Sequence, residues 1–177
     1  GTVICANGSC PVWTAGVFGN AIKLDGVDDY VNVSDSSSVN MSGNVLTLSA
    51  WVNFSTTAGA GTTQRIISKT AGSGSEQYEL FYTSDSHATP NKFRFDIGNS
   101  TSLTSLYTNE TFTSTNIWYH VAGVYNSSHM IIYVNSREKN VTVYAGGITG
   151  RVSDVNIGRA ASGGQNFNGT IDEVRIY

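Results

Sequence analysis

The sequence contains few charged residues, and this scarcity limits what the protein can bind through long-range electrostatics. Asp, Glu, Lys and Arg make up 13% of the 177 residues, and the formal net charge is −3. Soluble domains contain about a quarter charged residues on average. The chain has no run of Lys or Arg. We therefore expect no basic patch of the kind that attracts nucleic acid or an anionic membrane surface.

Long apolar stretches and helical periodicity are also missing. No apolar stretch approaches the roughly 18 residues that span a bilayer, so we expect no membrane insertion. Instead, short runs rich in Val, Ile, Tyr, Phe and Thr are separated by clusters of Gly, Ser and Asn. This pattern is typical of an all-β sandwich or barrel, and the length suits one domain with a single core.

Twelve short runs have the composition of β-strands. They cover residues 21–24, 30–33, 46–54, 64–69, 77–83, 92–97, 105–107, 118–126, 129–135, 139–144, 154–157 and 169–177. In the third run every second residue from Leu46 to Phe54 is apolar, which places those side chains on one face of a strand. The polar turns at 126–129 and 135–138 each join two runs, and this arrangement predicts two consecutive hairpins.

Only two cysteines are present, Cys5 and Cys10, and an Asn-Gly turn lies between them. Their spacing lets the two sulfurs meet across a tight loop. A metal or redox pair would instead need a C-x2-C spacing and further Cys or His ligands nearby, and the chain has neither. The sequence therefore predicts a disulfide and an oxidising compartment.

N-glycosylation sequons are more frequent than the composition explains. They begin at Asn7, Asn32, Asn40, Asn53, Asn99, Asn109, Asn126, Asn140 and Asn168. The chain has 16 Asn and 41 Ser or Thr, from which chance gives roughly four sequons. The excess favours an N-glycosylated, secreted protein of the cell surface. Asn32 and Asn53 lie within strand patterns, where only an outward-facing side chain can carry a glycan.

Several of the strand-like segments together resemble a known family. The segments are 19–31, 48–52, 66–69, 118–122 with 132–135, 157–159 and 168–177. In this order they resemble the strands of bacterial and archaeal laminin-G-like domains, which belong to the concanavalin A-like lectins and glucanases. The resemblance implies an antiparallel two-sheet jelly-roll β-sandwich over residues 17–177. Residues 1–16, with the Cys loop, lie outside the shared pattern and are treated as an N-terminal segment.

The carboxylates do not have the spacing of a glycosidase. Glucanases that share the fold carry inward-facing acids on one strand, in a Glu-x-Asp-x-x-Glu pattern. Glu76 and Glu79 are three residues apart, and Asp172 and Glu173 are adjacent, so the members of each pair point to opposite faces of a strand. The three histidines have neither the spacing of metal ligands nor a nucleophile motif nearby. We therefore expect a non-catalytic module.

The resemblance also implies a structural calcium ion. In the family, the Asp-rich turn after the first strand often lies near the terminal Ile-Asp-Glu strand. That proximity would bring Asp25, the Gly26 carbonyl, Asp28 and Asp172 around one Ca²⁺, which prefers oxygen ligands. In the alternative reading these acids cap turns and pair with Lys23 or Arg175.

Two functions fit these features. The first is a binding module for glycans or surface partners, which is the usual role in the resembled family. For this role exposed tyrosines would supply the sugar platform, and Trp51 and Trp118 are expected to be core residues. The candidate tyrosines are Tyr78, Tyr82, Tyr107, Tyr125 and Tyr144. The second function is a subunit of a glycosylated surface filament or layer, in which residues 1–5 add as a strand to a neighbouring chain. In the alternative to this reading, residues 1–16 pack as an edge strand on their own sandwich.

Overall fold

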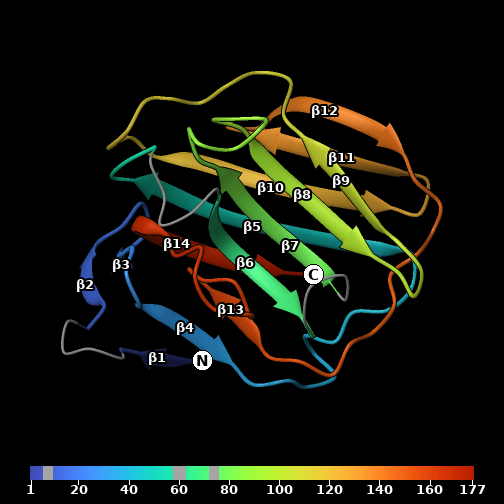
Figure 1. Ribbon diagram of the computed structural model, residues 1–177, viewed down its shortest axis with the longest axis horizontal. Coiled ribbons are helices and arrows are strands. Elements are labelled where there is room, and N and C mark those ends of the chain that lie inside the picture. The colour runs from blue at the N-terminus through green and yellow to red at the C-terminus, as the bar shows by residue number, and fades with distance from the viewer. Residues whose placement is uncertain (6–9, 58–62, 72–75) are drawn as a thin grey trace.

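The computed structural model describes residues 1–5, 10–57, 63–71 and 76–177, which form two antiparallel seven-stranded sheets packed face to face (Figure 1). The first sheet has the order β1 (Thr2–Ile4), β4 (Tyr30–Val33), β13 (Val155–Ile157), β6 (Thr63–Thr70), β7 (Glu76–Thr83), β8 (Phe93–Gly98) and β9 (Leu103–Tyr107). The second has the order β12 (Arg137–Val143), β11 (His129–Val134), β10 (Tyr119–Asn126), β5 (Val45–Phe54), β14 (Asn168–Ile176), β3 (Asn20–Asp25) and β2 (Val12–Ala15). In the described part of the chain there is no helix with the length and apolar character that crossing a membrane requires.

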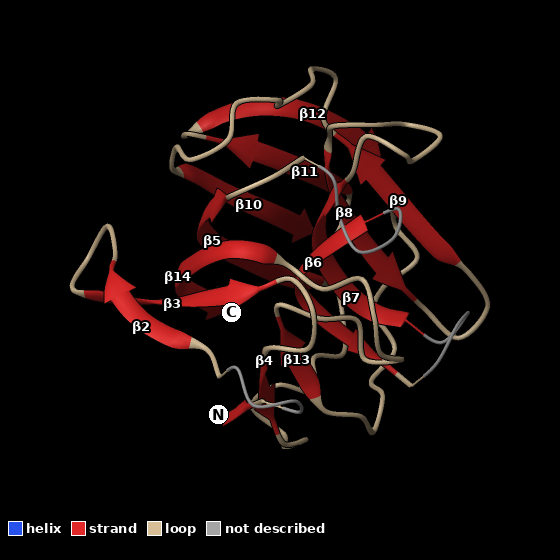
Figure 2. Cartoon of the chain, turned by 60° about the vertical axis from the view of Figure 1, so that its left-hand side comes forward, coloured by secondary structure: helices blue, strands red, loops and turns tan. Residues whose placement is uncertain are grey.

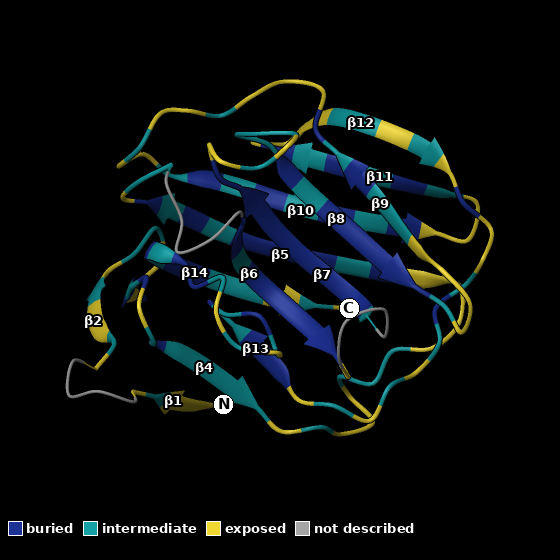
Figure 3. Cartoon of the chain, in the orientation of Figure 1, coloured by how far each residue is buried: buried dark blue, intermediate teal, exposed yellow. Residues whose placement is uncertain are grey.

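The core lies between the sheets, and side-chain alternation decides which residues enter it. Leu48, Val52 and Phe54 of β5 are fully buried. Phe54 stacks on Tyr82 of the first sheet, with ring centroids 4.7 Å apart, and on Tyr119 of β10 at 5.5 Å. Truncating a buried Phe of this kind costs about 3–5 kcal/mol. Figure 3 shows the same pattern, with β6, β7 and β8 buried along most of their length.

The predicted architecture is confirmed. All twelve predicted strands are present as β3 to β14, and the sandwich has two antiparallel sheets. The two predicted hairpins are formed by β10 with β11 and by β11 with β12.

The first sixteen residues contribute two strands that lie outside the twelve predicted runs, in keeping with the edge-strand alternative for this segment. β1 pairs with β4 in the first sheet (Figure 1), and β2 pairs with β3 at the edge of the second sheet (Figure 2). The segment thus packs on its own sandwich and adds an edge strand to each sheet. The predicted disulfide joins Cys5 to Cys10, whose Cα atoms are 4.8 Å apart. It closes the connection between β1 and β2.

Candidate functional site

Aromatic side chains gather on the outer face of the second sheet. Trp51 of β5 and His120 of β10 are cross-strand partners, and their ring centroids are 5.2 Å apart. Because Ala50 and Val52 face the core, the alternation of the strand turns Trp51 outward. Two adjoining cavities of about 590 and 220 Å³ share Phe18, Trp51 and His120. The first is also lined by Trp118, Asn135 and Ser136, and the second by Ser49, Glu173 and Arg175. We call this surface the aromatic groove.

Phe18 is held in the groove by Asp172. The Asp172 Oδ2 atom accepts hydrogen bonds from the backbone N–H groups of Val17 (2.8 Å) and Phe18 (3.1 Å). These two residues belong to the turn between β2 and β3, which is also closed by a hydrogen bond from the Gly16 N–H to the Gly19 carbonyl at 2.9 Å. Phe18 remains 63% exposed, so its ring is available to a ligand. Gly16 is required beside Asp172, because a Cβ atom at this position would lie 2.3 Å from Oδ2.

Polar groups border the aromatic rings. The Asn135 Oδ1 atom accepts a hydrogen bond from the His120 backbone N–H at 2.9 Å. A β-bulge in β14 between Asp172 and Arg175 presents Glu173 and Arg175 to the groove, where they form a 2.5 Å ion pair. Burial, together with the Arg175 charge, lowers the pKa of His120. The imidazole is therefore neutral at neutral pH and carries one donor and one acceptor nitrogen.

The structure reverses the expected places of the tryptophans and tyrosines. Trp51 and Trp118, expected in the core, are half-buried and line the groove. The tyrosines expected as a sugar platform are mostly core residues, namely Tyr78, Tyr82, Tyr125 and Tyr144. Burial raises the pKa of Tyr78 and Tyr82, as expected for phenols removed from water. Tyr107 is half-buried on the first sheet, where its hydroxyl accepts a hydrogen bond from Arg94 at 2.8 Å.

The outer face of the first sheet carries a buried ionic network. Glu79 of β7 and Asp96 of β8 are cross-strand partners, a relation that spacing within one strand cannot reveal. Arg65 lies 3.0 Å from Glu79, and Arg94 lies 2.7 Å from Asp96. Both guanidinium groups cover the ring of Phe81, at 3.8 and 4.9 Å from its centroid. Each acid is thus buried and paired with its own arginine.

Burial dominates the titration of this network. Desolvation raises the pKa of Glu79 to about 7, although Arg65 and a 2.6 Å hydrogen bond from the Ser68 hydroxyl act in the opposite direction. Desolvation likewise raises the pKa of Asp96 against the charge of Arg94.

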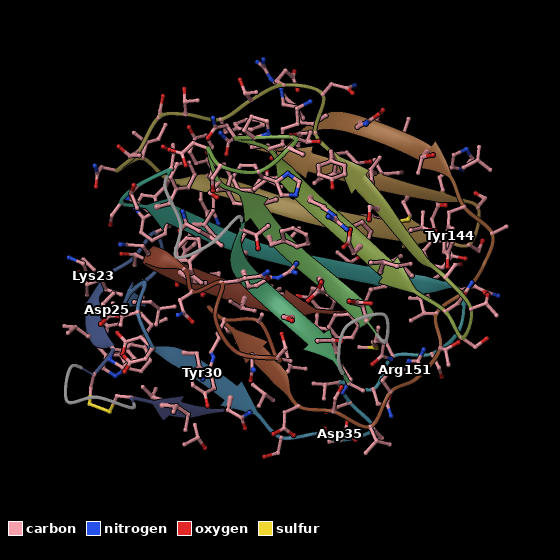
Figure 4. The ribbon with its side chains drawn as sticks, in the orientation of Figure 1. Lys23, Asp25, Tyr30, Asp35, Tyr144 and Arg151 are labelled. Atoms are coloured by element: carbon pink, nitrogen blue, oxygen red, sulfur yellow. A yellow bond between two sulfur atoms is a disulfide. The ribbon has the colours of Figure 1, made fainter. Side chains whose placement is uncertain are left out.

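The acidic turn between β3 and β4 brings together a partly different set from the predicted one. Carboxylate oxygens of Asp25, Asp28 and Asp29 lie within 4.8 Å of one another. The turn contains Gly26 at φ 81°, a conformation that favours glycine. Asp172 lies elsewhere: its two oxygens accept backbone N–H groups of Val17, Phe18 and Glu173. Lys23 and Asp25 are at the margin of the molecule in Figure 4.

Among the described residues, two buried oxygens of this turn have no hydrogen-bond partner. They are Asp28 Oδ2 and Asp29 Oδ1. Asp25 Oδ1 caps the turn by accepting the Val27 N–H at 2.8 Å, as the alternative reading of the sequence expects. Desolvation, helped by the charges of Asp25 and Asp28, raises the pKa of Asp29. Three clustered carboxylates with unsatisfied oxygens fit a cation that prefers oxygen ligands.

The sequons differ in how accessible their amides are. Asn109 and Asn126 are exposed, and Asn126 uses only its Oδ1 atom, which accepts hydrogen bonds from Ser128 and His129. The amide of Asn32 donates to Asp154 at 3.0 Å and to Asn156 at 3.2 Å. The other half-buried sequon asparagines are Asn40, Asn53, Asn99, Asn140 and Asn168. Asn7 lies outside the described residues.

We expect glycans on Asn109 and Asn126, and none on Asn32, in folded protein from a eukaryotic secretory host. A glycan on Asn32 would displace both hydrogen bonds of its amide. Peptide mass spectrometry after enzymatic deglycosylation, which converts each modified Asn to Asp, measures occupancy at every sequon. An unmodified Asn126 would contradict the assignment.

Comparison with known proteins identifies the family of the chain. Residues 25–177 match the concanavalin A-like lectin/glucanases superfamily. No curated protein matches the chain. Domain 4 of AbnA, an extracellular arabinanase from Geobacillus stearothermophilus solved with arabinotriose, has 21% identity and a TM-score of 0.71. The alignment covers 96% of this chain and 76% of that one.

Two further structures share the fold at lower identity. The CBM40 domain of the Ruminococcus gnavus IT-sialidase, bound to α2,3-sialyllactose, has 15% identity and a TM-score of 0.63, covering 89% of each chain. The mouse laminin α1 chain, domains LG4-5, has 9% identity and a TM-score of 0.65. That alignment covers 88% of this chain and 40% of the laminin chain, so the present chain spans less than half of it. Because the family match extends over most of the sequence, the chain belongs to the concanavalin A-like lectin/glucanases superfamily.

Proposed function

We propose that this chain is a non-catalytic extracellular module that binds a glycan in the aromatic groove. The observation that carries the proposal is the cluster of Phe18, Trp51 and Trp118 on the outer face of the second sheet. Large aromatic side chains on a soluble domain are usually buried, and a group of them at the surface marks a binding site.

The chemistry of the groove suits a sugar. One face of a pyranose or furanose ring is lined by C–H groups, which pack against an aromatic ring. The hydroxyls around the ring need donors and acceptors, which Asn135, Glu173 and Arg175 offer at the border of the groove. This combination of apolar floor and few polar groups is what small-molecule sites share.

Three further observations support the proposal. Two of the similar structures contain an oligosaccharide, arabinotriose in one and α2,3-sialyllactose in the other. Glu79 and Asp96 are ion-paired and buried, which leaves them poorly placed for hydrolysis. The disulfide between Cys5 and Cys10 favours an oxidising compartment.

Titration calorimetry with a panel of oligosaccharides tests the proposal. The panel contains the neutral oligosaccharides arabinotriose, xylotriose, cellotriose and mannotriose. Saturable binding of at least one member is expected. Absence of binding across the panel and on a broad glycan array would contradict the proposal.

The filament alternative finds less support. Its donor segment includes β1, which is paired with β4 from Thr2 to Ile4 within the same chain. A segment that already completes its own sheet is not free to complete another. Sedimentation of the purified chain tests this point, because strand exchange between chains would appear as concentration-dependent polymers.

We also propose that the acidic turn binds a structural Ca²⁺ through Asp25, Asp28 and Asp29. Support comes from the clustering of the three carboxylates and from the unpartnered oxygens of Asp28 and Asp29. The ion would relieve the repulsion and desolvation that the turn otherwise carries. Asp172, expected as a ligand, serves the Phe18 turn instead.

Calcium should therefore raise the melting temperature, and EDTA should reverse the effect. At a concentration about 100 times the dissociation constant the stabilisation is about 3 kcal/mol, or about 5–10 °C for a domain of this size. Differential scanning calorimetry of the wild type and of Asp28→Asn measures it. Asp28→Asn should lose the response, whereas Asp85→Asn, a change at an exposed acid away from the turn, should keep it. An Asp28→Asn protein with an unchanged calcium response would refute the site.

A further inference from the structure

A second, polar pocket lies on the outer face of the first sheet, away from the aromatic groove. Its volume is about 350 Å³, near the lower end of the roughly 300–1,000 Å³ of small-molecule sites. Its lining includes Tyr30, Asn32, Asp154, Asn156 and Arg159. β4, β13 and the loop that follows β13 supply most of the lining. Figure 4 labels Tyr30 on β4.

Arg159 stands in this pocket without a charge partner. Its guanidinium carbon lies 4.7 Å from the centre of the Tyr30 ring. Across the described parts of the chain, Arg159 makes no hydrogen bond or ion pair, although it is half-buried. The stacking leaves the N–H groups at the edge of the guanidinium free to point away from the ring. A planar fork of donors fixed in this way suits the two oxygens of a carboxylate.

A buried amide adds a second unused donor. Asn156 is 7% exposed, and its Oδ1 atom accepts the amide of Asn32 at 3.2 Å. Within the part of the chain that the structure describes, the Nδ2 group of Asn156 has no acceptor. This group is not among the buried atoms that lack a partner, so it is open to the pocket and can donate to an oxygen-bearing ligand.

Asp154 gives the pocket an acceptor. Its Oδ2 atom accepts the Asn32 amide at 3.0 Å, and its Oδ1 atom accepts the Asp35 backbone N–H at 2.9 Å. These two hydrogen bonds lower the pKa of Asp154 and keep it ionised. A carboxylate oxygen has lone pairs to spare after one hydrogen bond, so it can also accept from a ligand hydroxyl. The negative charge of Asp154 directs any ligand anion towards Arg159 instead.

We propose that this pocket binds a sugar acid, with the ligand carboxylate on Arg159 and Asn156 and its ring hydroxyls on Asp154. A neutral sugar would leave Arg159 without an anionic acceptor. A simple inorganic anion would leave Asp154 unused. A hexuronic acid carries a carboxylate and vicinal hydroxyls on one ring and therefore satisfies all three groups. The site is independent of the aromatic groove, because it lies on the other sheet and shares no residue with it.

The pocket also needs Asn32 in its unmodified form. The Asn32 amide bridges Asp154 and Asn156, and a glycan on this sequon would both break the bridge and fill the space. Protein for the experiment is therefore produced in a host without N-glycosylation.

Titration calorimetry with sodium D-galacturonate tests the assignment, with D-galactose, galacturonic acid methyl ester and sodium sulfate as comparison ligands. Galacturonate should bind at least about tenfold more tightly than galactose or the methyl ester. Arg159→Gln should lower galacturonate affinity at least about tenfold, and Arg159→Lys should lower it less, because Lys keeps the charge and loses the planar fork. Arg137→Gln, a change of the same type on the exposed edge strand β12, should leave it unchanged.

Each other outcome contradicts the proposal. Equal binding of galactose and galacturonate would show that the carboxylate is not recognised. Sulfate binding as tightly as galacturonate would indicate a general anion site. Unaltered galacturonate binding by an Arg159→Gln protein with a wild-type melting temperature would exclude Arg159. If that variant does not fold, Arg159→Lys carries the test. Trp51→Ala, which tests the groove, should not change galacturonate binding, so the two proposals can fail separately.

Discussion

Replacing Trp51 with Ala should weaken binding of a panel oligosaccharide at least about tenfold and leave the melting temperature nearly unchanged. Trp51 is shared by both cavities of the groove and packs against His120, so its removal takes away the centre of the apolar floor. Central aromatic residues of binding sites typically contribute about 2 kcal/mol or more, which corresponds to roughly 30-fold in affinity. Because Trp51 points away from the core, no large core cavity is created.

Trp13→Ala is the matched control. Trp13 lies on β2, is 66% exposed and does not line the groove. Its replacement removes the same type of side chain from the surface and should leave the dissociation constant unchanged. Calorimetric titration gives the constants, and a thermal melt checks the fold of both variants. Equal losses of affinity in the two variants, or no loss in either, would show that the groove is not the binding site.

Raising the pH from about 5 to 8 should destabilise the fold, with Glu79 as the main cause. Its pKa is about 7 in the folded protein against an ordinary value of 4.5. Between these values the folded state keeps a proton that the unfolded state has lost, so the free energy of unfolding falls as the pH rises through this window. A shift of this size corresponds to roughly 3 kcal/mol. The raised pKa values of Asp29 and Asp96 act in the same direction at lower pH.

Urea unfolding at pH 5 and pH 8 measures this dependence. Glu79→Gln removes the titrating group and should flatten the difference between the two pH values. The lowered pKa of His120 has the opposite effect, because below the ordinary pKa of histidine it makes the free energy of unfolding rise with pH. This contribution is present in the wild type and in Glu79→Gln, so it cancels when the two proteins are compared. Glu110→Gln, at an exposed acid whose pKa is lowered by Lys139, should keep the wild-type dependence. If Glu79→Gln kept the full pH dependence of the wild type, Glu79 would not be the cause of the destabilisation.

The alternation of apolar residues along the strands predicts which aromatic side chains face the groove better than residue type does. Leu48, Ala50 and Val52 are inward, so Trp51 had to be outward once β5 was recognised. The same parity places Tyr78 and Tyr82 with Leu80 in the core. The prediction from residue type placed tryptophan in the core and tyrosine at the surface. The position of each residue along its strand determines which face it occupies, and it gives the opposite result.

Other parts of the site depend on contacts that no local pattern records. Phe18 reaches the groove because Asp172, more than 150 residues away in sequence, holds its turn. Glu79 and Asp96 become neighbours only through the pairing of β7 with β8. In the acidic turn, Asp25 and Asp28 were predicted to lie together with Asp172. Asp172 lies elsewhere, because its oxygens accept hydrogen bonds from the Phe18 turn and from Glu173 in the β14 bulge.

The two ends of the chain differ in how they would resist a pulling force. β1 has three residues and pairs on one side only, at the margin of the first sheet. Its hydrogen bonds can open one after another, as in a zipper. β14 has nine residues and lies between β5 and β3 inside the second sheet. Extracting it requires many hydrogen bonds on both sides to break together. A tether at the N-terminal end should therefore yield at low load, and the Cys5–Cys10 bridge then passes the force to β2, which is also an edge strand. A tether at the C-terminal end should hold until the sandwich itself opens.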